Sequence, residues 1–138
     1  MEKYTVLKLI GLAILTMATL ILLSFIEVAI YSYFINPGHE VGIYESHAQD
    51  SAPYISGIFG FIIFFLVARY WTKKDYPNVF KLILLFPVIY ILLDILIIVI
   101  AGFRDISSYI LIFLLSNGAK FLGSFLGYKL SGLKAGNL

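Results

Sequence analysis

The stretch at residues 79–101 reads VFKLILLFPVIYILLDILIIVIA, and its only charged residues are Lys81 and Asp94. A helix on the surface of a soluble protein carries polar residues along one face, and this stretch has no such face. A helix of roughly 20 apolar residues crosses the hydrocarbon core of a bilayer, which is about 30 Å thick. The stretch therefore predicts a transmembrane helix, with a bend at Pro87.

Three further apolar stretches occupy residues 6–35, 53–71 and 108–130. The chain has 138 residues, of which 61% are hydrophobic and only 13% are charged. A soluble domain of this size would contain far more charge and shorter apolar runs. The sequence thus predicts an all-α integral membrane protein with one domain over residues 1–138, folded as a four-transmembrane-helix bundle.

Two short polar signals define the segment between the first two predicted spans. The tripeptide Asn36-Pro37-Gly38 ends the first span, because proline cannot continue a helix and glycine permits a turn. Ser51 and Pro53 have the pattern of a helix cap and first turn, so the second span is expected to begin at residue 53. Residues 36–52 are therefore predicted to form the outer loop, with residues 39–52 partly ordered as a short helix over the mouth of the bundle.

Positive charges favour one orientation in the membrane. Arg104 is the sole Lys or Arg on one predicted side, where residues 36–52 carry acidic groups and no positive residue. Cytoplasmic flanks of membrane helices are enriched in Lys and Arg. Both termini are therefore predicted to be cytoplasmic, with residues 36–52 and 102–107 outside. The residues on the predicted cytoplasmic side are Lys3, Lys8, Arg69, Lys73, Lys74, Lys81, Lys129 and Lys134.

Composition excludes several classes of function. The chain has no cysteine, which rules out disulfides, thiolate metal sites and iron–sulfur clusters. Its net charge of +2 is spread over the span ends, so nucleic acid is not an expected partner. The expected partner is the lipid bilayer, and no cofactor is predicted.

Charged residues inside the predicted spans are the best lead to function, because a charge at the bilayer centre costs about 2.5–3.5 kcal/mol on insertion scales. At about 1.5 Å of rise per residue, Glu27 lies roughly 13 Å and Asp94 roughly 12 Å below the outer boundary. By the same rise, Asn117 lies roughly 15 Å and Lys120 roughly 20 Å below it. Glu27, Asp94 and Asn117 are therefore predicted to share one interior layer. Lys120 is expected within salt-bridge reach of at least one acid.

Helical spacing adds two tyrosines to this predicted site. Tyr31 shares the helix face of Glu27, and Tyr90 shares the face of Asp94. The six residues form the candidate transport or ligand-binding site. Three interpretations stay open: a structural network that holds the helices together, a proton or ion pathway, and a pocket for a small ligand.

The predicted outer loop holds the candidate metal ligands His39, Glu40, His47 and Asp50. Histidine and carboxylate side chains suit zinc and other divalent ions. Their spacing matches no standard zinc pattern, so a solvated polar loop is the favoured interpretation. A lid whose histidines relay protons near neutral pH is the second interpretation, and a divalent metal site is the third.

The last predicted span contains a GxxxG pattern formed by Gly123 and Gly127, and the second span offers Ser56 and Gly60 at the same spacing. Small residues at this spacing allow two helix backbones to approach closely. We expect the pattern to pack inside the chain in preference to making a dimer. Four helices leave little room for a central pore, so transport would require a homodimer or a larger assembly.

The leading functional hypothesis is a small membrane protein that moves or senses protons, ions or a small solute through its Glu, Asp and Lys residues. The first alternative is a non-transporting scaffold or accessory subunit with a structural polar network. The second is an intramembrane enzyme or metal-binding protein that uses the outer His and Glu residues. No nucleophile is paired with a base by any sequence motif, so catalysis is the less favoured hypothesis.

Overall fold

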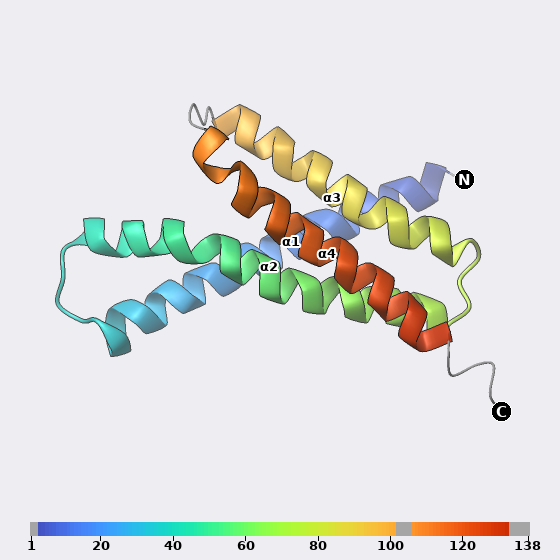
Figure 1. Ribbon diagram of the computed structural model, residues 1–138, viewed down its shortest axis with the longest axis horizontal. Coiled ribbons are helices and arrows are strands. Elements are labelled where there is room, and N and C mark those ends of the chain that lie inside the picture. The colour runs from blue at the N-terminus through green and yellow to red at the C-terminus, as the bar shows by residue number, and fades with distance from the viewer. Residues whose placement is uncertain (1–2, 102–105, 133–138) are drawn as a thin grey trace.

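The computed structural model describes residues 3–101 and 106–132 (Figure 1). The helices are α1 (Lys3–Ile30), its π-helical continuation η1 (Tyr31–Ile35), α2 (Val41–Lys73), α3 (Val79–Ala101) and α4 (Ile106–Gly132). Each of the four long helices is long and apolar enough to cross a membrane. The predicted fold class, an all-helical four-span bundle, is confirmed. Arg104 and the C-terminal residues 133–138 lie outside the described residues.

The second span starts earlier than the predicted boundary. Helix α2 begins at Val41, so that only residues 36–40 connect it to η1, and Pro53 lies inside the helix. Proline removes one helical hydrogen bond, which frees the carbonyl of Gln49 one turn earlier. The extension holds nevertheless, because its first turns make side-chain contacts with α1 and η1. The predicted loop 36–52 is thus mostly the first part of a 33-residue helix.

The α1–α2 hairpin is longer than the bilayer core. At about 1.5 Å per residue, 33 residues of α2 extend about 50 Å, against about 30 Å of hydrocarbon. Such a helix either tilts or continues above the membrane. In Figure 1 the α1–α2 hairpin reaches beyond the ends of α3 and α4, and the two hairpins diverge toward the α1–α2 connection. We call the end of the bundle at the α1–α2 connection the hairpin end.

The aliphatic and aromatic core lies between α1, α2 and α3. Phe64 of α2 is fully buried and stacks on Phe86 of α3, with ring centroids 4.3 Å apart. Tyr90 meets the same Phe64 ring edge-on at 5.5 Å. Since lipid tails are as apolar as these side chains, close packing rather than water exclusion holds the helices together. The buried hydrophobic residues of α1 lie on one helical face and are Leu9, Ala13, Met17 and Leu20.

Helices α2 and α4 approach each other closely along the GxxxG pattern. A Cβ atom added to Gly123 would collide with the backbone oxygen of Phe61, and one added to Gly127 would collide with that of Phe65. Only glycine permits this backbone separation. The expectation that the pattern packs inside the chain is therefore confirmed. The close contact also brings the polar residues of α4 against α2.

Candidate functional site: two polar clusters on opposite sides of helix α2

The first polar cluster surrounds Lys120, whose side chain is fully buried. Its stem lies against Gly60 of α2, where an added Cβ would be 2.8 Å from the lysine Cε. Its Nζ donates to Ser56 Oγ at 2.9 Å and to Ser116 Oγ at 3.0 Å. It also lies 3.4 Å from the Ser116 carbonyl oxygen and 3.4 Å from Asn117 Oδ1. An ammonium group has three hydrogens, so these acceptors use its full donor capacity.

Asn117 links this lysine to a carboxylate. Its Nδ2 donates to Asp94 Oδ2 at 3.3 Å and to the Phe113 carbonyl oxygen at 3.1 Å. Both amide hydrogens are therefore used, and its Oδ1 accepts from Lys120. The side chain is fixed in one orientation by its three partners, and it presents a donor to Asp94.

The predicted direct salt bridge between Lys120 and an acid is not formed. Among the described residues no ion pair joins Lys120 to a carboxylate, because Asn117 lies between Lys120 and Asp94. The lysine points toward Ser56 of α2 instead, along the space left by Gly60. Its Nζ also lies 4.9 Å from the ring centroid of Tyr90, which is a favourable cation–π distance.

Asp94 and Asn117 open onto a cavity of about 540 Å³ between α2, α3 and α4. Ser56 and Ser116 complete its polar wall. Cavities of this size are typical of small-ligand sites, which combine apolar walls with a few polar groups. The remaining lining residues are Ala48, Gln49, Ala52, Pro53, Ile112 and Phe113.

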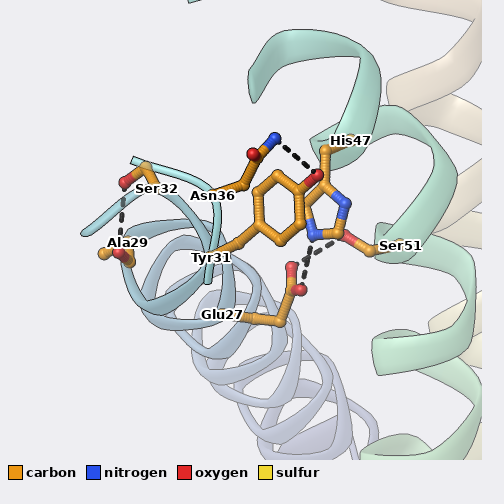
Figure 2. A network of polar contacts seen from close by, with 7 residues as sticks. All are labelled: Glu27, Ala29, Tyr31, Ser32, Asn36, His47 and Ser51. Carbon is orange, nitrogen blue, oxygen red and sulfur yellow. Dashed lines mark hydrogen bonds and ion pairs between the residues drawn. The ribbon is translucent and has the colours of Figure 1, made fainter. Parts of the chain in front are cut away.

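The second polar cluster joins α1 to the first turns of α2 (Figure 2). Glu27 Oε1 lies 2.7 Å from His47 Nε2, and Ser51 Oγ donates to Glu27 Oε2 at 2.8 Å. The side chains of Glu27 and His47 are 27% and 25% exposed. The ring of Tyr31 stacks on the imidazole, with centroids 3.6 Å apart and planes 7° apart. Both carboxylate oxygens of Glu27 are thus occupied by side chains of α2.

Hydrogen bonds around the α1–α2 connection extend this cluster to the hairpin end. Asn36 Nδ2 donates to the Tyr31 hydroxyl at 3.1 Å. The Tyr44 hydroxyl donates to the Asn36 carbonyl oxygen at 2.9 Å and accepts from the His39 backbone N–H at 3.0 Å. These hydrogen bonds therefore hold Asn36 and His39, which lie near the two ends of the connection.

Ser51, His47 and Glu27 are the residue types of a hydrolytic triad, but their hydrogen bonds are not those of a triad. A nucleophilic serine must hydrogen-bond to the histidine, and the acid must orient that histidine from its other side. Here both Ser51 and His47 bond to the carboxylate of Glu27. The geometry favours a contact between helices over nucleophilic catalysis.

The two clusters lie on opposite sides of α2. Each residue of an α-helix is rotated by about 100° from the one before it, so Ser56, nine positions after His47, points about half a turn away. Helix α2 therefore stands between Glu27 and the cavity that Asp94 lines. The six predicted site residues therefore do not meet in one place: Asp94, Asn117, Lys120 and Tyr90 form one cluster, whereas Glu27 and Tyr31 belong to the other.

The four candidate metal ligands do not assemble in the described part of the chain. Across residues 3–101 and 106–132, no three side chains of His, Asp or Glu converge on one point. His47 contacts Glu27, and His39 donates its backbone N–H to the Tyr44 hydroxyl. Glu40 precedes α2 as its N-cap residue without a side-chain cap hydrogen bond.

Sequence reasoning missed the roles of several hydroxyl groups. The sequence pattern indicates only a small packing residue at Ser56, yet this serine accepts the shortest hydrogen bond from Lys120. Ser116 precedes Lys120 by one helical turn, a spacing that could have identified it. The sequence predicts Ser51 to be a helix cap, but its hydroxyl donates to Glu27.

Comparisons with protein-family models, with curated proteins and with solved structures found no match to this chain. A fold class by itself does not determine activity. The function is therefore argued from the geometry of the two clusters.

Proposed function

We propose that this four-span membrane protein binds a small solute in the cavity between α2, α3 and α4, and that it senses or moves this solute. The observation that carries the proposal is the Asp94 carboxylate on the wall of a cavity of about 540 Å³. Ionisable residues at membrane depth are costly, and they commonly mark substrate or ion sites.

The hydrogen-bond pattern supports binding over a purely structural network. In a scaffold, the polar groups would satisfy one another completely. The polar groups of Lys120 and Asn117 are fully used. The Asp94 carboxylate is not, because among the described residues it accepts one hydrogen bond, from Asn117 to Oδ2. The Oδ1 atom of Asp94 therefore keeps acceptor capacity, and Asp94 is one of the residues that line the cavity.

The same geometry supports sensing more directly than transport. Lys120 is buried beyond the polar wall, and the close contact at Gly123 and Gly127 lies further along α4. Passage of a solute to the other side would require this α2–α4 contact to separate. Transport is thus proposed only for an assembly in which the helices rearrange, such as a homodimer or larger oligomer.

For the orientation, we propose that both termini are cytoplasmic and that the hairpin end is outside. The support is the distribution of Lys and Arg, which favours the cytoplasmic side in short connections. In this orientation the cavity receives solutes from the outer half of the membrane.

The test is a thermal-unfolding screen of the purified protein in detergent against small amines, alcohols and carboxylic acids. A ligand raises the unfolding temperature by binding the folded state. We expect stabilisation by at least one class and its loss in Asp94→Asn. Liposome flux with the stabilising solute then separates transport from sensing. If no solute stabilises the protein and Asp94→Asn matches wild type in every assay, the scaffold is the better account.

A further inference from the structure

We propose that the solute is a protonated amine with a compact apolar body, bound with its ammonium group at Asp94. This inference rests on the proposed binding function and names the chemical class of its ligand. It follows from which hydrogen-bonding groups around the cavity are already used and which are free.

The free acceptor belongs to a carboxylate. Asp94 Oδ2 accepts from Asn117, whereas no hydrogen bond to Oδ1 occurs among the described residues. A carboxylate in a low-dielectric site is stabilised by a cation that also donates hydrogen bonds. An alkylammonium group supplies both the positive charge and the N–H donors.

The protein's own cation does not fill this position. Lys120 is held by Ser56, Ser116 and Asn117, and Asn117 separates it from Asp94. An anionic solute entering the cavity would meet the carboxylate of Asp94, while the buried ammonium has no free donor to offer. Charge complementarity therefore favours a cation over an anion.

The other lining residues of the cavity indicate the polarity and shape of the rest of the solute. Ser116 Oγ accepts from Lys120, which leaves the hydrogen of its hydroxyl free to donate. Ala52, Ile112 and Phe113 supply apolar contact area. A short amine with an aromatic or branched body, with or without a neighbouring oxygen acceptor, matches these walls.

The charge distribution at the hairpin end favours the same class. The sequence contains no Lys or Arg between Lys8 and Arg69, while Glu45 and Asp50 lie on the first turns of α2. Glu45 is one turn before Gln49 at the cavity wall, so it shares that side of the helix. Acidic groups near a cavity raise the local concentration of cations and accelerate their binding.

The experiment compares three isosteric probes by isothermal titration calorimetry of the full chain in detergent micelles: phenethylamine, 2-phenylethanol and phenylacetate. We expect phenethylamine to bind at least tenfold more tightly than the alcohol and phenylacetate not to bind. Asp94→Asn should reduce amine binding to the level of the alcohol, and Asp94→Glu should retain the preference for the amine.

A second variant keeps the test decisive if Asp94→Asn does not fold. Ala52→Phe fills the cavity wall and should abolish amine binding at unchanged helix content, while Leu92→Phe, at an exposed position of α3, should bind as wild type. Equal binding of amine and alcohol would overturn the amine class and leave the binding function standing. Absence of binding by all three probes in wild type would overturn this inference, and the broader solute screen would then decide the binding function.

Discussion

Replacement of Lys120 by methionine tests the organisation of the buried network most sharply. The substitution keeps the length of the stem beside Gly60 and removes the ammonium group. An interhelical hydrogen bond inside a membrane contributes about 0.6 kcal/mol on average and at most about 1.7 kcal/mol. Loss of the bond to Ser56 is therefore a modest effect.

The larger effect comes from Asn117, which is 4% exposed and would lose the donor to its Oδ1 atom. A buried acceptor without a partner costs about 1–3 kcal/mol. The variant also removes the desolvation cost of the ammonium, which offsets part of the loss. We expect Lys120→Met to lower the free energy of unfolding by about 2 kcal/mol, on the basis of these ranges.

The assay is equilibrium unfolding in mixed micelles with increasing denaturing detergent, followed by helix content. Leu122→Met, at a lipid-exposed position of the same helix, is the matched control and should change stability by less than about 0.5 kcal/mol. In a double-mutant cycle, Lys120→Met and Asp94→Asn should couple by more than about 0.5 kcal/mol, and Asn117→Leu should reduce this coupling. Wild-type stability in Lys120→Met, or a coupling energy that is unchanged in the Asn117→Leu background, would refute the asparagine bridge.

Three further predictions concern the helix contacts and the orientation. Gly123→Ala should destabilise the protein by more than about 1 kcal/mol because its Cβ meets a backbone oxygen, whereas Gly118→Ala, which has open space, should be neutral or stabilising by up to about 1 kcal/mol; unfolding curves compare the two. Glu27→Gln should speed amide exchange in the first three turns of α2, since it weakens the contact with α1, and exchange equal to wild type would count against that contact. In whole cells, an impermeant thiol reagent should label a cysteine at Glu45 but not one at Lys74, and the reverse pattern would invert the proposed orientation.

The fold could be predicted from the sequence because a bilayer imposes one strong condition. Long apolar runs such as residues 79–101 must form helices that satisfy their own backbone groups. The start of α2 could not be predicted in the same way. Ser51 and Pro53 have the local pattern of a helix start. The helix extends back to Val41 because His47 contacts Glu27 and Tyr44 contacts Asn36.

The sequence could predict that Glu27 and Asp94 take part in polar clusters, but not that they belong to different ones. The rise per residue gave comparable depths for Glu27 and Asp94, and each residue does belong to a polar cluster. The side of α2 on which each cluster lies depends on how the helices are rotated and packed. That arrangement follows from close packing at Gly60, Gly123 and Gly127. The sequence shows these glycines but does not show which helix each of them contacts.

The central claim is that the Asp94 cavity admits a solute from water, and cysteine accessibility tests this claim most directly. Because the chain has no cysteine, Ala52→Cys introduces a single thiol at the cavity wall. In native membranes this thiol should react with a small water-soluble methanethiosulfonate amine, and phenethylamine should slow the reaction. A cysteine at Leu111, which is 65% exposed on the helix surface, should not react because it faces lipid. An unreactive Ala52→Cys in folded protein would contradict the account and indicate a closed, structural network.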